Sequence, residues 1–197
     1  MQYLIYSTLV GEYDEKPNSR EVISHYPTEI AGLSDRRKSR YYKINSHLLP
    51  DHHISVYLDA CLKLTGANLP TTQKDIAVFH HPNRGCIYKE ALLCQRLRLG
   101  NGEQIREQVK RYKDQNFPMD LGLGENCFII RKNNNRVKKF NEIWWEEYIK
   151  GSERDQMSFM YAVWKSGVRL EFLEGNPRDN RYYTNWGNHK KPRNKQG

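Results

Sequence analysis

The chain has 197 residues, a length that fits one domain whose core is large enough to fold without disulfide or metal cross-links. Hydrophobic residues make up 38% of the sequence, and no apolar run is as long as a membrane span, which argues against a membrane-spanning helix. The formal net charge of +9 suits phosphate groups on a nucleotide, a nucleic acid or a membrane surface. A solvated basic surface and tail explain it as well, so charge alone does not decide between these classes.

The first half of the chain contains three short β-rich segments and one basic segment. Residues 2–10 alternate in hydrophobicity and predict a strand. Residues 36–48 are basic with scattered aromatic side chains and predict a helix. Residues 54–58 and 76–79 are apolar and rich in β-branched side chains, so they predict two further strands.

Helical patterns dominate the second half. Residues 87–98 and 103–115 predict two helices, and residues 137–148 and 155–165 predict two more. Between these pairs, residues 127–130 predict another internal strand. Short strands that alternate with helices indicate one α/β domain with a mainly parallel central sheet flanked by helices.

A sheet of this kind binds its ligands outside the carboxyl ends of its strands. This rule directs attention to Asp59, to residues 80–84 and to the loop after Ile130. The four cysteines lack the paired short spacing of a zinc site, and the first residues lack the pattern of a signal peptide. We therefore expect reduced thiols and a cytoplasmic location.

Asp59 directly follows the predicted strand at residues 54–58. A carboxylate at the end of a buried strand needs a cation, a hydrogen-bond donor or water. One solution is a Mg²⁺ or Mn²⁺ ion that bridges a nucleotide diphosphate, because these ions prefer carboxylate and phosphate oxygens. A strand-end cap or a salt bridge with a nearby arginine is the alternative, and spacing alone favours that alternative.

Several spaced motifs follow one another between residues 36 and 165. The first are Arg40-x-x-Lys43, Leu48-Leu49-Pro50-Asp51 and Ser55-Val56-Tyr57-Leu58-Asp59-Ala60. The later ones are His81-x-x-Arg84-x-Cys86-x-Tyr88-x-Glu90-Ala91, Phe117-Pro118, Gly122-Leu123-x-Glu125, Ile130-Arg131, Trp144-Trp145 and Arg154-Asp155-Gln156-x-Ser158-Phe159. In this order, the motifs resemble a glycosyltransferase-like family that includes plant turgor- and mucilage-related proteins and many bacterial polysaccharide proteins.

The resemblance implies a GT-A-like fold, which is a single Rossmann-like domain that binds a nucleotide-sugar and carries an acidic motif at a strand end. GT-A enzymes commonly have two acids flanking one residue in that motif, whereas this chain has Asp59-Ala60-Cys61. On this resemblance, Asp59 holds Mn²⁺ or Mg²⁺ together with the donor diphosphate. The missing second acid leaves the metal dependence open.

Asp155 lies in Ser152-Glu153-Arg154-Asp155-Gln156, just before an apolar helical run. Ser152 and Asp155 have the spacing of a capping box, so a structural helix start is one explanation. The Asp-Gln pair also resembles one that lies near the donor sugar in glycosyltransferase family eight. On that resemblance, Asp155 is catalytic and Gln156 binds the donor.

Glu125 follows a Gly-Leu-Gly turn and precedes the predicted strand at residues 127–130. Its place resembles the position under the donor sugar in GT-A enzymes, which makes Glu125 a second catalytic candidate. A solvated turn acid is the alternative. Arg131 stands near the other end of the same strand, where we expect it to pair with a donor phosphate or with one of these acids.

Four further residues are candidates for donor binding. Arg40 and Lys43 have three-residue spacing on one helical face, which suits a nucleotide base or diphosphate, although a solvated basic face has the same pattern. His81 and Arg84 end a predicted strand at the expected crevice. Adjacent histidines point to opposite sides of an extended chain, and the family resemblance selects His81.

The last residues form a basic segment that contains Trp186 and His189. A late histidine followed by lysine and proline resembles the closing metal-binding histidine of glycosyltransferase family eight. We predict a GT-A-like domain over residues 1–184 and a tail over residues 185–197 that folds over the donor site, with His189 as a second metal ligand. A solvated histidine beside a basic tail is the alternative.

Together these features predict a glycosyltransferase that moves a sugar from a nucleoside diphosphate donor to a hydroxyl of a glycan or other acceptor, in glycan or polysaccharide synthesis. One alternative is a basic nucleic-acid-binding protein that stacks bases on its tyrosines and tryptophans. A second is a non-catalytic relative that binds glycans or nucleotides. We favour the enzyme, without a nucleic-acid partner.

Overall fold

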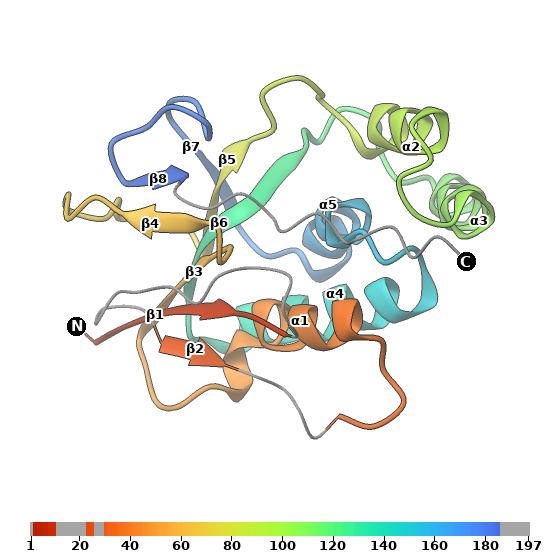
Figure 1. Cartoon of the computed structure of the whole chain (residues 1–197). Coiled ribbons are helices and arrows are strands. Elements are labelled where there is room, and N and C mark those ends of the chain that lie inside the picture. The colour runs from red at the N-terminus through yellow and green to blue at the C-terminus, as the bar shows by residue number, and fades with distance from the viewer. Residues whose placement is uncertain (1, 11–22, 26–29, 186–197) are drawn as a thin grey trace, which may run out of the picture.

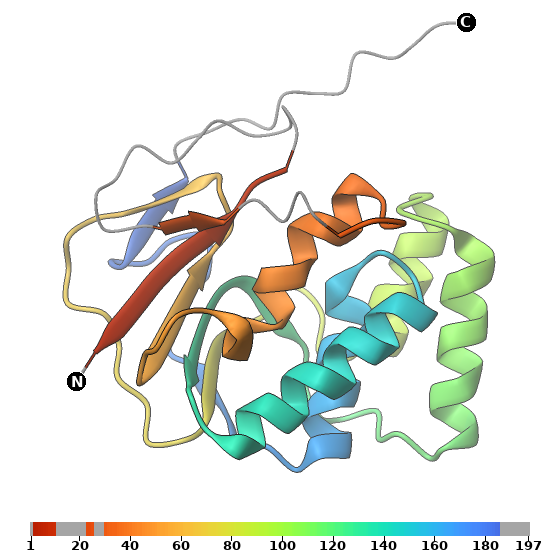
Figure 2. The ribbon, with the colours of Figure 1, turned by 90° about the horizontal axis from the view of Figure 1, so that it is seen from below.

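The computed structural model describes residues 2–10, 23–25 and 30–185. It has a twisted central sheet with its helices packed against one face (Figures 1 and 2). The sheet has six strands, in the spatial order β2 (Ile23–His25), β1 (Tyr3–Thr8), β3 (Ile54–Leu58), β6 (Gly124–Lys132), β5 (Ile76–His80) and β7 (Leu170–Leu173). All of them run in the same direction except β6, which is antiparallel to both of its neighbours. The predicted α/β class with a mainly parallel sheet is confirmed.

The predicted helices are present as separate elements. They are α1 (Asp35–Ile44), α2 (Ile87–Arg96), α3 (Gly102–Asp114), α4 (Asn135–Lys150) and α5 (Asp155–Ser166). The helix expected over residues 36–48 ends at Ile44, and a short 3-10 turn, η1 (Ser46–Leu48), follows it. Asn45 ends the helix because its backbone is not helical and its side-chain amide donates back to the Tyr41 carbonyl at 3.0 Å.

The two faces of the sheet are covered differently. Tyr57 and Ile129 face the layer of helices, whereas their neighbours Val56 and Ile130 face the other side. That second side packs against a two-stranded ribbon of β4 (Leu62–Leu64) and β8 (Tyr183–Asn185). Helices therefore cover one face of the sheet and a small ribbon contributes to the other. Within the described ranges, no helix is long and apolar enough to cross a membrane.

The direction of β6 corrects one expectation. The strand predicted over residues 127–130 extends from Gly124 to Lys132 and runs against β3 and β5. Its beginning, with Glu125, therefore lies beside the carboxyl ends of β3 and β5. The loop after Ile130 lies beside the amino ends of those two strands. Alternating hydrophobicity reveals a strand but not its direction, which is why the loop after Ile130 was wrongly expected at the crevice.

Arg131 is enclosed in the layer between the sheet and the helices, with no exposed surface. Its Nη1 donates to the Ile44 carbonyl at 3.0 Å and to the Asn141 side chain at 3.1 Å, and its Nη2 donates to the Lys43 carbonyl at 2.7 Å. The last carbonyls of a helix have no partner within that helix. Arg131 supplies the missing donors, so it fixes the end of α1 against β6.

We expect Arg131→Met to lower the free energy of unfolding by about 3 kcal/mol, because two buried carbonyls lose their charged donor. Urea unfolding of the purified variant measures this change. Arg136→Met is the matched control, since the Arg136 side chain is 62% exposed, and it should change stability by less than about 0.5 kcal/mol. Equal stability of the two variants would contradict a clamping role for Arg131.

Candidate functional site

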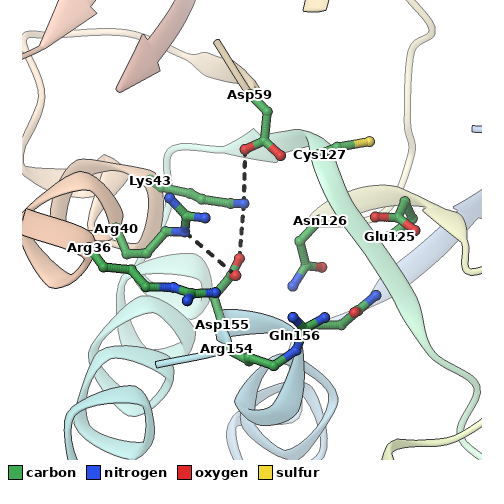
Figure 3. Close-up of a pocket in the computed structure, with 10 residues that line it drawn as sticks. All are labelled: Arg36, Arg40, Lys43, Asp59, Glu125, Asn126, Cys127, Arg154, Asp155 and Gln156. Carbon is green, nitrogen blue, oxygen red and sulfur yellow. Dashed lines mark hydrogen bonds and ion pairs between the residues drawn. The ribbon is translucent and has the colours of Figure 1, made fainter. Parts of the chain in front are cut away.

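A polar pocket of about 150 Å³ lies at the carboxyl end of β3, between α1, the beginning of β6 and the start of α5 (Figure 3). It is lined by Arg36, Arg40, Lys43, Asp59, Glu125, Asn126, Cys127, Arg154, Asp155 and Gln156. Six of these were predicted as site residues from the sequence: Arg40, Lys43, Asp59, Glu125, Asp155 and Gln156. Four different parts of the chain thus meet where the strand-end rule places a ligand.

Asp59 is held by two donors from neighbouring elements. Its Oδ1 accepts a hydrogen bond from the Tyr57 hydroxyl at 2.7 Å and from Lys43 Nζ at 3.1 Å. Its backbone N–H donates to the Cys127 carbonyl at 2.8 Å, so the end of β3 stays attached to β6. A salt bridge is therefore present, as one interpretation of this strand-end acid anticipated, and its partner is a lysine.

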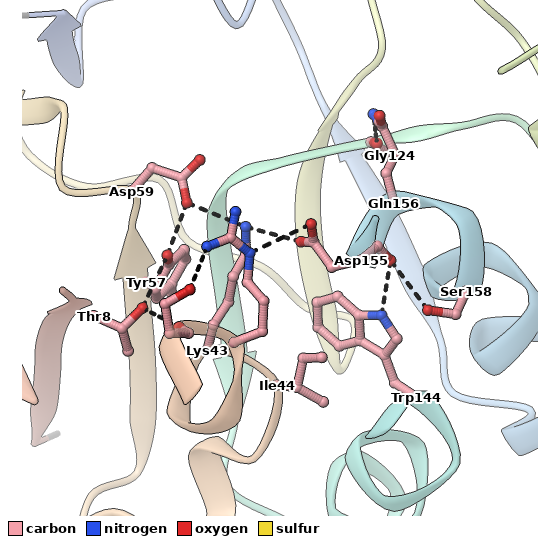
Figure 4. Close-up of polar contacts among 12 residues, drawn as sticks. Thr8, Lys43, Ile44, Tyr57, Asp59, Gly124, Trp144, Asp155, Gln156 and Ser158 are labelled. Carbon is pink, nitrogen blue, oxygen red and sulfur yellow. Dashed lines mark hydrogen bonds and ion pairs between the residues drawn. The ribbon is translucent and has the colours of Figure 1, made fainter. Parts of the chain in front are cut away.

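Lys43 lies between two carboxylates (Figure 4). Its side chain is only 2% exposed, and its Nζ is 3.1 Å from Asp59 Oδ1 and 2.9 Å from Asp155 Oδ2. Burial alone would lower the pKa of Lys43, but the charges of Asp155 and then Asp59 raise it above its usual value. Lys43 is therefore a permanent buried cation that joins α1 to β3 and α5.

Asp155 is the first residue of α5 and is held in its ionised form. Arg40 Nε lies 3.6 Å from its Oδ1, whereas Lys43 contacts its Oδ2. Burial would raise the pKa of Asp155, but Lys43 and then Arg40 hold that pKa well below its usual range. The Trp144 indole fixes the backbone here, because its Nε1 donates to the Asp155 carbonyl at 3.0 Å.

The capping-box explanation of Asp155 is wrong. Arg154 is the N-cap of α5, and the Ser152 hydroxyl accepts from the Arg154 N–H at 3.4 Å instead of capping a later residue. Asp155 turns toward Lys43 and Arg40 because two cations there attract it more strongly than a backbone N–H does. The neighbouring Gln156 donates its side-chain N–H to the Gly124 carbonyl at 2.9 Å, which ties α5 to β6.

Glu125 differs from Asp155 in its surroundings. Its side chain is 25% exposed, and its Oε2 lies 3.6 Å from Nε2 of the buried His81. Burial, and then the negative charge of Asp59, raise the pKa of Glu125 above its usual value. The pocket thus contains two carboxyl groups whose pKa values are displaced in opposite directions, an arrangement typical of a site that separates acid–base work from charge stabilisation.

His81 is the buried neighbour of Glu125. Its Nδ1 accepts hydrogen bonds from the backbone N–H groups of Asn83 at 3.1 Å and Arg84 at 3.2 Å. Its Nε2 lies 3.6 Å from Glu125 Oε2 and 2.7 Å from Nη2 of Arg84, a group that can only donate. Burial and then the positive charge of Arg84 lower the pKa of His81, which favours a neutral ring.

Three predicted donor-binding residues are not among the residues that line the pocket: His81, Arg84 and Arg131. Arg84 forms an ion pair with Glu90 and lies 2.7 Å from His81 Nε2, so it is committed to supporting contacts. Arg131 is enclosed in the core at the end of α1. His189, the predicted second metal ligand, lies outside the described residues, as does residue 186 onward of the predicted tail.

Four pocket residues were not predicted: Arg36, Asn126, Cys127 and Arg154. Arg36 was visible only as part of a basic cluster, and Arg154 only as part of a motif around Asp155. Asn126 is an amide inside a strand and 4% exposed. A polar side chain on a buried strand needs a partner, and this signal would have singled it out had the strand been predicted to begin at Gly124.

The described side chains do not form a complete metal site by themselves. Among residues 2–10, 23–25 and 30–185, no group of three or more His, Cys, Asp and Glu residues is arranged to hold a metal ion. Asp59 Oδ1 is occupied by Lys43 and Tyr57, which leaves Oδ2 for another ligand. One carboxylate oxygen fits an ion that takes its other ligands from phosphate and water, as Mg²⁺ often does.

A family model described as "TOD1/MUCI70, glycosyltransferase-like domain" matches residues 32–174. The match covers most of the chain and includes every residue that lines the pocket. A comparison with curated proteins gives no match.

We expect Lys43→Met to lower the free energy of unfolding at pH 7 by about 3 kcal/mol, because Asp155 and Asp59 lose their shared cation. The folded-state pKa of Asp155 lies below its unfolded value of about 3.9, so the ion pair stabilises the fold above that pH. Its contribution is lost as the pH falls below about 4. Urea unfolding at several pH values should therefore show the gap between wild type and variant narrowing in acid.

Lys38→Met provides a control on the same helix. Lys38 pairs with Asp35, whose side chain is 72% exposed, and such a pair contributes less than about 1 kcal/mol. A Lys43 variant that behaves like the Lys38 variant at every pH would show that the buried ion pair does not stabilise the fold.

Proposed function

Because the chain belongs to the TOD1/MUCI70 family of glycosyltransferase-like domains, we propose that it transfers a sugar from a nucleoside diphosphate donor to a hydroxyl group of an acceptor. The observation that supports this proposal most strongly is the pair of unlike carboxyl groups in one pocket. Asp155 is kept ionised by Lys43 and Arg40, and Glu125 has a raised pKa beside a neutral histidine. In glycosyl transfer, a carboxyl group can take up the acceptor proton or stabilise an oxocarbenium-like centre, and this pair offers one group for each task.

In the proposed reaction, the acceptor oxygen attacks the anomeric carbon of the donor. The bond from that carbon to the diphosphate oxygen breaks, and the nucleoside diphosphate leaves with the bonding electrons. The acceptor proton passes to the carboxylate of Glu125, whose raised pKa makes it a stronger base than an ordinary glutamate. The buried His81 ring lies beside that carboxylate, with its Nε2 3.6 Å from Glu125 Oε2.

Charge in the transition state is matched by fixed groups of the pocket. Positive charge builds up on the sugar ring, and the permanent anion of Asp155 stabilises it. Negative charge builds up on the departing diphosphate, and Arg36 and Arg40, which line the pocket on α1, face that charge. Lys43 acts indirectly, because its ammonium is already shared between Asp59 and Asp155.

We propose that Mn²⁺ or Mg²⁺ enters this site together with the donor diphosphate. Asp59 Oδ2 would hold the ion, and His189 is the predicted second protein ligand. When bound, the ion neutralises charge on the diphosphate. Since Lys43 already neutralises the other oxygen of Asp59, we expect the protein to hold the ion weakly without nucleotide.

The proposed acceptor is a glycan or another molecule with a free hydroxyl group, within glycan or polysaccharide synthesis in the cytoplasm. A non-catalytic relative that binds the same nucleotide-sugar is the second candidate, supported by Cys61 at the position of the usual second acid. Turnover separates the two, because only the enzyme releases nucleoside diphosphate when donor and acceptor are supplied together.

Binding of UDP or GDP tests the donor site. We expect one of them to raise the melting temperature, and to raise it further with Mn²⁺, while Mn²⁺ alone has little effect because Asp59 offers it one free oxygen. Asp59→Asn should remove the metal-dependent increment and keep the increment due to nucleotide alone. A melting curve that neither nucleotide moves at millimolar concentration would refute the donor site.

Glu125→Gln tests the proposed base. We expect turnover to fall by roughly 10²–10⁴-fold, because the amide of glutamine cannot accept the acceptor proton. In the wild type, kcat/KM should decline as the pH falls through the raised pKa of Glu125, since the protonated carboxyl cannot accept a proton, and the variant should lack this decline. Glu153→Gln is the control, because Glu153 pairs with Arg37 and is not among the residues that line the pocket. An unchanged rate in the Glu125 variant would remove Glu125 from the mechanism.

A further inference from the structure

Asn126 has a buried amide that finds no hydrogen-bond partner in the described part of the chain. The residue is 4% exposed, and neither its Oδ1 nor its Nδ2 forms a hydrogen bond with any described residue. It lines the pocket between Glu125 and Cys127 on β6, and Figure 3 shows its amide pointing into the space between Lys43 and Gln156. A buried amide left in this state costs folding free energy, so its retention needs an explanation.

Another buried asparagine in the same layer is fully satisfied. Asn141 has no exposed surface, its Oδ1 accepts from Arg131 at 3.1 Å, and its Nδ2 donates to the Ser46 hydroxyl at 3.2 Å. The fold therefore supplies partners for an asparagine amide when the role is structural. The missing partners of Asn126 lie in the pocket, which indicates that a bound molecule provides them.

The chemistry of the amide narrows the class of that molecule. An asparagine amide presents one acceptor and two donors in a plane, which matches two neighbouring hydroxyl groups, one donating to Oδ1 and the other accepting from Nδ2. A phosphate has no proton for Oδ1 and suits the arginines of the pocket better. The side-chain N–H of Gln156 already donates to the Gly124 carbonyl, whereas both polar atoms of the Asn126 amide lack a partner among the described residues.

The shape and lining of the pocket agree with a sugar. A volume of about 150 Å³ is of the order that holds one six-membered ring, well below that of a whole nucleotide-sugar. None of the lining residues is aromatic, so the pocket offers no stacking surface for a base. A polar, ring-sized pocket is suited to the sugar of the donor, with the nucleotide outside it.

We propose that Asn126 is a specificity-determining residue that binds two neighbouring hydroxyl groups of the donor sugar, an inference that rests on the proposed function. Asn126 discriminates between sugars that differ at those hydroxyls. A donor that lacks one of them leaves the buried amide half-satisfied, which is the strongest form of rejection available to a binding site.

The first test compares the two buried asparagines by thermal unfolding without ligand. Asn126→Leu should melt at or above the wild-type temperature, because it removes an unsatisfied amide and keeps the volume. Asn141→Leu should melt lower by roughly 5 °C or more, because Arg131 and Ser46 lose the hydrogen bonds that they form with the Asn141 amide. A loss in Asn126→Leu as large as that in Asn141→Leu would assign Asn126 a structural role and overturn the proposal.

The second test measures binding by calorimetry to UDP, GDP, a panel of UDP- and GDP-hexoses, and the singly deoxygenated forms of the hexose donor that binds best. Asn126→Leu should bind the nucleoside diphosphate as the wild type does, but bind the hexose donor at least tenfold more weakly. Removing the contacted hydroxyl from the donor should weaken wild-type binding at least tenfold and leave binding to the variant unchanged.

The outcomes separate a failure of the role of Asn126 from a failure of the donor site. Equal affinity of wild type and Asn126→Leu for every hexose donor would overturn the role of Asn126 and leave the donor site standing. Failure of the wild type to bind any nucleoside diphosphate or hexose donor would refute the proposed function, and the inference about Asn126 with it.

Discussion

The buried ammonium of Lys43 is the charge around which the site is organised. A lysine with a 2% exposed side chain needs anionic partners, and Asp59 and Asp155 provide them from β3 and α5. The backbone of the same residue is fixed from the opposite side, because its carbonyl accepts from Arg131 at 2.7 Å. Lys43 thus links the helix, the sheet and the start of the last helix, and its position depends on a second buried cation in the core.

This one interaction explains why the three carboxyl groups of the pocket behave differently. Asp155 forms ion pairs with Lys43 and Arg40 and therefore stays ionised. Asp59 accepts a hydrogen bond from Lys43 through one of its two oxygens. No lysine or arginine of the described residues forms an ion pair with Glu125, whose contact at 3.6 Å is with the neutral ring of His81. The three side chains carry the same functional group. Their different proposed roles in the reaction therefore follow from the position of the Lys43 ammonium.

Much of the framework could be predicted from the sequence, because its signals are local. The strand at Ile54–Leu58 was predicted with its observed bounds, since a β-branched run ends at a charged residue. The meeting of Lys43, Asp59 and Asp155 was anticipated only as membership of one site. Their mutual ion pairs depend on side-chain directions that spacing does not reveal.

The failures have physical causes of the same kind. Arg131 was assigned to the donor because it stands near a strand end, but β6 runs in the opposite direction and its end at Arg131 lies inside the core. Ser152 and Asp155 have the spacing of a capping box, and tertiary ion pairs replace the cap. Asn126 was missed because an unsatisfied amide is defined by what surrounds it, which one sequence does not show.

The most direct test of this account is an NMR titration of the side-chain carboxyl carbons of Glu125 and Asp155 in the folded protein. We expect Glu125 to take up its proton at a higher pH than an ordinary glutamate. We expect Asp155 to remain ionised to the lowest pH at which the protein is folded, and to gain its proton at a higher pH in Lys43→Met. Titration of both groups together, near the ordinary values of about 4, would contradict it.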